Sequence, residues 1–169
     1  MGLFDKLFGK KEEINPNHIY APMAGEVVEI NVEINVVPDP TFAEGMLGNG
    51  VAIKPTDGKV YAPVNGTVDT MFDTGHACSL VSENGIEILI HVGLETVGLN
   101  GAPFQVKVQN GQKVKKGQLL FEADLAAIEA AGLPTITPVL VCNSDDYSTF
   151  NVSTGKTVTN ADVVIELGK

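Results

Sequence analysis

Residues 86–93 (IEILIHVG) show the clearest alternation in the chain, because positions 86, 88, 90 and 92 all hold Ile or Val. The positions between them hold Glu, Leu, His and Gly. This period of two is typical of a β-strand with one buried face, since successive side chains of a strand point to opposite faces. The pattern therefore predicts that His91 lies on the face of this strand that points away from the core.

A second strand is predicted just before the first, at residues 76–82 (HACSLVS), with turn residues at 83–85 between them. A two-residue hairpin loop gives paired residue numbers that sum to 167 or 169. Either register places His76 and His91 on one exposed face, roughly 5 to 8 Å apart at Cβ. A three-residue loop, with a sum of 168, would separate them. The two-residue registers therefore predict a site built from two of the three histidines in the chain.

The rest of the body consists of short apolar runs separated by Gly, Pro, Asn and Asp, which predicts ten or more short strands. The clearest helix is short, at residues 125–131, with Asp124 as its N-cap. The pattern therefore predicts an all-β protein with little helix.

The body also repeats itself. Residues 21–27 (APMAGEV) recur as residues 62–68 (APVNGTV), a shift of 41 positions. Residues 110–120 recur loosely as residues 154–164, a shift of 44 positions. Two similar halves of this kind predict an antiparallel β-sandwich or flattened barrel with an internal duplicated motif.

The N-terminal residues differ from the body, because their apolar side chains gather on one side of a helical wheel. We expect two parts: a flexible segment at residues 1–18 and a single β-sandwich domain at residues 19–169. The segment is either a tail that caps the sandwich or an amphipathic helix that contacts a membrane surface. The apolar side chains concerned are Leu3, Phe4, Leu7 and Phe8.

Charge and composition limit the partners and ligands that the chain can bind. The chain has 169 residues and a formal charge of −10, which argues against nucleic acid as a partner. All 11 basic residues are lysines, so a phosphate would be held by imidazole N–H, by backbone N–H or by an arginine from a partner. The two cysteines form no disulfide framework, which favours a reducing cytoplasm, and Cys142 in the run PVLVC is expected to be buried.

Three kinds of chemistry suit two adjacent imidazoles. They could bind a metal together with Cys78, which is two positions from His76, although no Asp or Glu nearby completes a catalytic set. One could act as a general base, but the sequence contains no catalytic triad. One could itself accept a phosphoryl group while the other stabilises the charge, which requires neither metal nor triad. The remaining alternative is that both histidines are ordinary surface residues.

Four segments carry a resemblance to a known family: VPDPTFAE (37–44), GNGVAIKP (48–55), TGHA (74–77) and IHVGLETV (90–97). In order and spacing they resemble the glucose-family enzyme IIA of the bacterial phosphotransferase system. The resemblance extends from about Tyr20 to the C-terminus. It implies an antiparallel β-sandwich on a duplicated motif, which agrees with the repeats.

The resemblance also implies a reaction. His91 would take a phosphoryl group at Nε2 from the phosphohistidine of the carrier HPr and pass it to a cysteine on the IIB domain of a glucose-type sugar permease. His76 would stabilise the phosphoryl group by hydrogen bonding, and the Thr74 hydroxyl would orient the His76 ring. The Gly93 carbonyl would accept from His91 Nδ1–H and so fix the tautomer. The protein would be a phosphotransferase component that needs no cofactor and holds no metal of its own.

For partner binding, the resemblance implies an apolar docking ring with acidic positions that receive arginines from partners. The sequence departs from the family pattern at Cys78, where many relatives have an aromatic residue, and at residues 29–35, which form a longer stretch than usual. The apolar positions are Phe42, Met46, Leu47, Phe72 and Leu89, and the acidic positions are Asp39 and Glu95.

The N-terminal segment resembles the start of stand-alone relatives that touch anionic membranes, so we expect a cytoplasmic protein with weak peripheral contact at the inner face. Two alternatives remain. Residues 111–117 (GQKVKKG) resemble lipoyl and biotinyl carriers, but the chain lacks their modifiable lysine turn. A purely regulatory protein, which binds permeases or kinases and shares a zinc ion with them through His76 and His91, could use the same face.

Overall fold

The computed structural model describes residues 15–30 and 48–168. Four of the expected docking residues, Asp39, Phe42, Met46 and Leu47, lie outside the described residues. So do residues 1–14 of the N-terminal segment and most of the stretch 29–35.

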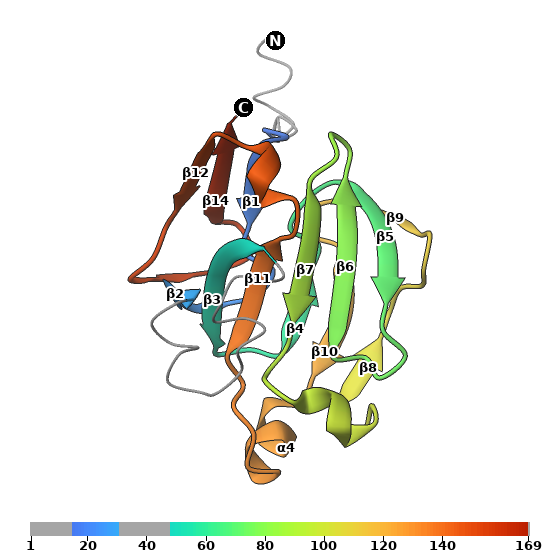
Figure 1. Cartoon of the computed structure of the whole chain (residues 1–169). Helices are drawn as coiled ribbons and strands as arrows, with labels where there is room; N and C mark the ends of the chain where they lie inside the picture. Colours follow the sequence, from blue (N-terminus) through green and yellow to red (C-terminus); the bar gives the residue numbers. More distant parts are fainter. Residues whose placement is uncertain (1–14, 31–47, 169) are drawn as a thin grey trace, which may run out of the picture.

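Fourteen strands form three antiparallel sheets in the described residues (Figure 1). Two sheets have three strands each, in the orders β1-β14-β12 and β4-β10-β8. Their bounds are β1 (His18–Tyr20), β14 (Val163–Gly168), β12 (Thr149–Val152), β4 (Lys59–Tyr61), β10 (Leu119–Ala123) and β8 (Phe104–Val106). The predicted all-β class is confirmed. His18, which was assigned to the N-terminal segment, is the first residue of β1.

The third sheet has eight strands in the order β13-β2-β3-β11-β7-β6-β5-β9. Strands that are distant in the sequence are neighbours in this sheet: β11 lies between β3 and β7 (Figure 1). Their bounds are β13 (Lys156–Val158), β2 (Gly25–Glu29), β3 (Asn49–Pro55), β11 (Thr137–Val141), β7 (Glu87–His91), β6 (Ala77–Ser82), β5 (Gly66–Met71) and β9 (Lys113–Val114).

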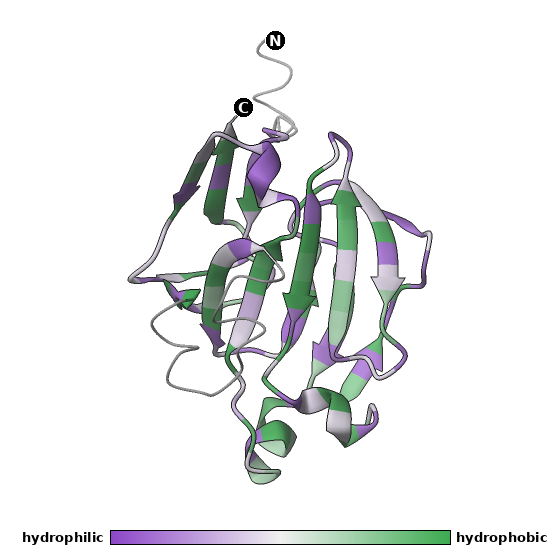
Figure 2. Cartoon of the chain, in the orientation of Figure 1, coloured by the Kyte–Doolittle hydropathy of each residue, from purple (hydrophilic) through white to green (hydrophobic). Residues whose placement is uncertain are grey.

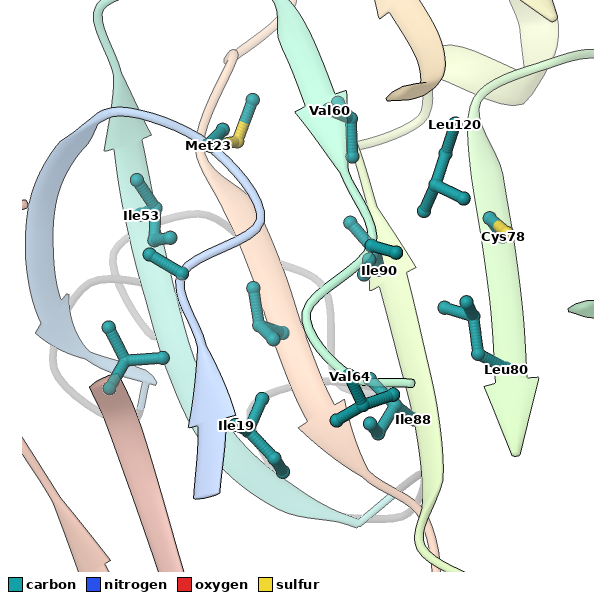
Figure 3. Packing of buried hydrophobic residues seen from close by; sticks show 14 of the residues in the cluster. Ile19, Met23, Ile53, Val60, Val64, Cys78, Leu80, Ile88, Ile90 and Leu120 are labelled. Atoms are coloured by element: carbon teal, nitrogen blue, oxygen red, sulfur yellow. The ribbon is translucent and has the colours of Figure 1, made fainter. Parts of the chain in front are cut away.

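The main core lies between one face of the large sheet and the two small sheets. Ile88 and Ile90 of β7 are at most 1% exposed, as the alternation predicted. They pack in one cluster with Ile19 of β1, Val60 of β4 and Leu120 of β10, which Figure 3 shows together. Each such side chain contributes about 1.5–3 kcal/mol when it is fully buried. Figure 2 shows the same division, with apolar residues along the central strands and polar residues in the turns.

The duplication predicted from the sequence is present in the backbone. Tyr20 N–H donates to the Pro63 carbonyl at 3.0 Å, and Tyr61 N–H donates to the Pro22 carbonyl at 2.7 Å. Both pairs are related by the shift of 41 positions, so the two repeats exchange equivalent hydrogen bonds. They meet as two copies related by an approximate two-fold axis.

The second shift is present as well. Gly111 N–H donates to the Val68 carbonyl and Gly155 N–H to the Val27 carbonyl, both at 2.8 Å. The donors differ by 44 positions and the acceptors by 41. Strand β9 therefore pairs with β5 as β13 pairs with β2, and this equivalence allows the two halves to be compared residue by residue.

The predicted helix is α4 (Leu125–Ala130), in which Ile128 is buried. The Asp124 side chain accepts from Ala127 N–H at 3.1 Å, so Asp124 is the N-cap as expected. Two 3₁₀ turns, η2 (Thr96–Leu99) and η3 (Ser144–Asp146), complete the regular structure of the described residues. In residues 15–30 and 48–168, no helix has the length and apolar character needed to cross a bilayer.

The expectation that Cys142 is buried was wrong, because its side chain is exposed. Strand β11 ends at Val141, and Cys142 is the first residue after it. Its side chain lines a groove on the outer face of the large sheet with Asp69 and Ser79. The apolar run in the sequence is therefore one residue longer than the buried strand.

Candidate functional site

His76 and His91 lie side by side at one end of the large sheet. His91 is the last residue of β7, and His76 immediately precedes β6. The ring centroids are 4.8 Å apart, and the ring planes cross at 80°. The pairing of the two histidines predicted from the sequence is therefore present.

The predicted hairpin register was wrong. Ala77 pairs with His91 and Ser79 with Leu89, so the paired residue numbers sum to 168. That register was expected to separate the histidines, because it places them on opposite faces of a regular hairpin. They meet because His76 lies outside β6, where the chain bends at Gly75 (φ +71°) and strand alternation no longer applies.

Glycines allow the backbone to bend beside both histidines. A Cβ on Gly93 (φ +74°) would lie 2.6 Å from Thr96 Cγ2 and 2.7 Å from the Pro134 carbonyl oxygen. A Cβ on Gly75 would lie 2.7 Å from Phe104 Cβ. Both positions therefore require glycine for backbone conformation and for space. Gly75 was not predicted as a site residue, although it directly precedes a histidine in the sequence as Gly93 closely follows one.

The hydrogen bond of His91 defines its tautomer. His91 Nδ1 lies 2.8 Å from the Gly93 carbonyl oxygen, the contact expected from the sequence. A carbonyl oxygen can only accept a hydrogen bond, so Nδ1 carries the proton. In the neutral ring the lone pair is then on Nε2, which makes Nε2 the nucleophilic nitrogen.

His76 is held by a neighbouring hydroxyl. Thr74 Oγ1 lies 2.5 Å from His76 Nδ1. Burial, and secondly the proximity of His91, lowers the pKa of His76 to about 4. His76 is therefore neutral near pH 7. When the Thr74 hydroxyl donates to Nδ1, the ring proton is on Nε2 and is available as a hydrogen-bond donor.

The expectation that both histidines are exposed was wrong for His76, which is only 4% exposed. Its ring is flanked by Phe72, with centroids 5.4 Å apart, and by His91. The His91 side chain is half-buried. A visiting group would therefore reach His91 from solvent and meet His76 as the inner wall of the site.

Three of the expected docking residues, Phe72, Leu89 and Glu95, lie within the described residues. Phe72 is 38% exposed and Leu89 is half-buried, so both side chains are accessible from solvent. Leu89 packs against a second buried cluster on the face of the large sheet opposite the main core. Glu95 is exposed just before η2, in a left-handed conformation (φ +62°). The buried residues of the second cluster are Ile30, Ala52, Leu94, Ile136 and Leu140.

Cys78 does not face the imidazoles, which corrects its suggested role as a third metal ligand. It is fully buried in the main core, near Leu80 and Leu120 (Figure 3). Burial raises the pKa of the Cys78 thiol to about 12, so the thiol stays protonated. Cys78 lies within β6 and follows the strand alternation. His76 precedes the strand, beyond the bend at Gly75, so the two side chains do not share a face.

Comparison with known proteins identifies relatives of the chain. Residues 17–147 match the family described as phosphoenolpyruvate-dependent sugar phosphotransferase system, EIIA 1. A PTS system glucose-specific EIIA component from Haemophilus influenzae is 41% identical over 170 residues, covering the whole of both chains. Another from Bacillus anthracis is 44% identical over 157 residues and covers 93% of each chain.

Two further similarities are to part of a longer protein and to a solved structure. A PTS system beta-glucoside-specific EIIBCA component from Dickeya chrysanthemi is 47% identical over 144 residues, which are 85% of this chain and 22% of that protein. The solved structure of glucose permease IIA from Mycoplasma capricolum is similar at a TM-score of 0.78, with 33% identity. That similarity covers 88% of this chain and 93% of the other.

Proposed function

The chain belongs to the EIIA 1 family of the phosphoenolpyruvate-dependent sugar phosphotransferase system, and we propose that His91 Nε2 is its phosphoryl acceptor. The protein is a phosphotransferase component of sugar transport. One observation carries the finer assignment. The hydrogen bond from His91 Nδ1–H to the Gly93 carbonyl places the lone pair of the neutral ring on Nε2, in a half-buried side chain.

The proposed first step is an exchange between two imidazoles. His91 Nε2 attacks the phosphorus of phosphohistidine on HPr, and a new P–N bond forms as the bond to the HPr ring breaks. The electron pair of the broken bond returns to the HPr imidazole. The proton on His91 Nδ1 stays in its hydrogen bond to Gly93, which stabilises the positive charge that the attack places on the ring.

In the second step, a cysteine thiolate on the IIB domain of a sugar permease attacks the same phosphorus. A P–S bond forms, the P–N bond breaks, and its electron pair returns to His91 Nε2. The chain needs no cofactor for either step, because the phosphoryl group is carried by the protein itself.

His76 acts as a catalytic residue in this proposal, because it stabilises the phosphoryl group by direct hydrogen bonding. Its lowered pKa keeps it neutral, and the Thr74 hydroxyl directs its remaining proton to Nε2. With the ring centroids 4.8 Å apart, that N–H can donate to an oxygen of a phosphoryl group on His91. This donor is important in a chain that has no arginine to offer.

The proposed partners are HPr and the IIB domain of a glucose-type permease. The relatives named glucose-specific support the sugar, and the EIIBCA relative supports a IIB partner, since it is named for IIB and IIA parts in one protein. Phe72 and Leu89 supply apolar contact beside His91, and Glu95 can receive an arginine of the partner. The expected membrane contact of the N-terminal segment is a further proposal, which the described residues do not include.

The experiment is phosphorylation by phospho-HPr, followed by intact-protein mass spectrometry. The chain should gain one acid-labile phosphoryl group, and His91→Gln should gain none. His18→Gln is the matched control, because His18 lies in β1 and pairs with Glu166 rather than with the site. Labelling of the His91→Gln protein at the unmodified rate would exclude His91 as the acceptor.

A further inference from the structure

A polar pocket lies at the end of the large sheet opposite the two histidines. It has a volume of about 680 Å³ and is bounded by the start of β5, the end of β6, and β9 with the turn that follows it. Strand β6 runs from the histidine site to this pocket, and its five residue steps span about 17 Å. The polar residues that line the pocket are Asn65, Thr67, Ser82, Glu83, Lys113, Lys115 and Gln118.

Hydrogen-bond donors predominate in this pocket. The side-chain oxygen of Asn65 accepts from Lys116 N–H at 2.8 Å, and that of Gln118 accepts from Lys115 N–H at 3.2 Å. With each amide oxygen engaged by the backbone, each NH₂ group is left as a donor. The ammonium groups of Lys113 and Lys115 add two positive charges, in a chain whose formal net charge is −10.

The duplicated half shows which of these groups the fold needs. Thr159 N–H donates to the Asp162 carboxylate at 2.9 Å, in the turn equivalent to that of Lys115 and Gln118. The turn therefore requires an acceptor oxygen at this position but not an amide NH₂ group. A carboxylate meets that requirement in one half of the molecule, and an amide meets it in the other.

The other donors are likewise absent from the equivalent half. By the shifts of 41 and 44 positions, Lys113 and Lys115 correspond to Thr157 and Thr159. Asn65 corresponds to Ala24. The same backbone thus forms without these donor groups. Their presence together around one pocket is not explained by folding.

We propose that this pocket binds a small hydroxylated phosphate compound. Two ammonium groups and two amide NH₂ groups suit the several acceptor oxygens of a phosphate. Glu83 would repel inorganic phosphate but can accept hydrogen bonds from hydroxyl groups. A volume of about 680 Å³ is of the size that proteins use for small organic ligands. The matching chemistry is therefore a phosphate at one end and hydroxyl groups at the other.

Two sources supply this chemistry: a free sugar phosphate and the headgroup of a lipid such as phosphatidylglycerol. Titration of the ¹⁵N-labelled full chain with glucose 6-phosphate, inorganic phosphate or glucose tests the first source by amide chemical shifts. Sedimentation with phosphatidylglycerol vesicles tests the second source. Shift changes should occur at residues 65–67, 81–83 and 113–118 and be absent from the equivalent turn at 157–162.

Variants make the test specific. The double change Lys113→Thr with Lys115→Thr introduces the residues of the equivalent turn and should weaken binding about tenfold or more. Gln118→Glu keeps the acceptor for Lys115 N–H but replaces the donor with a negative oxygen, and it should also weaken binding. Glu83→Gln should strengthen inorganic phosphate binding, because it removes the repulsion, and should lower the preference for glucose 6-phosphate over inorganic phosphate.

The matched control is Lys59→Thr with Lys156→Thr, which changes the net charge equally at exposed positions away from the pocket. It should alter binding by no more than about twofold. Equal weakening by the two double variants would overturn the proposal, since it would show non-specific attraction to the whole chain. Failure of both glucose 6-phosphate and the vesicles to bind at millimolar concentration would also overturn it. None of these outcomes depends on phosphorylation of His91.

Discussion

The two ends of the hairpin β6–β7 differ in what determines their structure. Along the strands, alternation alone assigns each side chain: Ile88 and Ile90 enter the main core, and Leu89 lies on the opposite face. At the histidine end, the bends at Gly75 and Gly93 determine where the side chains point. Hydrophobic pattern thus determines the stability of this hairpin, whereas backbone conformation at two glycines determines its chemistry.

A cavity in the strand region should have the largest effect on stability. Ile90→Ala should lower the free energy of unfolding by about 2–5 kcal/mol, because Ile90 is fully buried in the main core. The folded fraction should still accept the phosphoryl group. Urea unfolding and initial rates of phosphorylation would measure the two effects.

Leu89→Ala is the matched control for the strand region, since the adjacent side chain is only half-buried on the opposite face. It should cost less stability than Ile90→Ala and instead weaken binding to HPr. If Leu89→Ala destabilised the protein as much as Ile90→Ala, the assignment of the two faces would be wrong.

A change at the turn should have an intermediate effect on stability and a larger one on chemistry. Gly93→Ala should cost about 1–3 kcal/mol, from left-handed strain and from contact with Thr96 and Pro134. It should also slow phosphoryl acceptance, because the carbonyl that holds His91 would move.

Gly85→Ala separates strain from contact. Gly85 has φ +92°, and a Cβ there would meet nothing within 4 Å. This variant should lose some stability but keep the rate of acceptance. Equal rates for Gly93→Ala and Gly85→Ala would show that the position of the Gly93 carbonyl does not matter for the reaction.

The effect of His76 on stability should be absent near neutral pH and appear only in acid. The pKa of His76 is lowered from 6.5 to about 4, so between these values the unfolded chain binds a proton that the folded chain does not. Stability should therefore fall as the pH drops from about 6.5 to about 4, and His76 should contribute no pH dependence above that range. His76→Gln should reduce this slope, measured by thermal unfolding at a series of pH values.

The same His76→Gln variant tests the proposed role of the second ring. It should still accept a phosphoryl group on His91 but transfer it to a IIB domain more slowly, because the donor to the phosphoryl oxygens is altered. Unchanged transfer, with an unchanged pH profile of stability, would leave His76 with a packing role alone.

The sequence predicted the elements that follow from local pattern. The alternation around Ile88 and Ile90, the N-cap at Asp124 and the duplicated motif were all confirmed. The hairpin register, the burial of His76 and the exposure of Cys142 were predicted wrongly. Each of these depends on where a strand ends, which is decided by glycine conformations and by packing between distant segments.

Two further features could not be predicted from local pattern. The cluster beneath Leu89 gathers Ala52, Leu94, Ile136 and Leu140 from separate segments, so no local periodicity identifies it. The repeat shows only that the two equivalent turns differ, since KVKKG stands opposite TVTNA. Only the structure shows that the lysines of this turn and Asn65 line the same pocket.

The exchanged hydrogen bonds of Tyr20 and Tyr61 have a consequence for ancestry. Such reciprocal bonds are what two separate copies of the repeat would form as a symmetric dimer. In such a dimer, every mutation appears twice and any active group comes in two copies. Fusion into one gene removes that constraint, so one copy can acquire a reactive pair of imidazoles while its twin keeps only the scaffold.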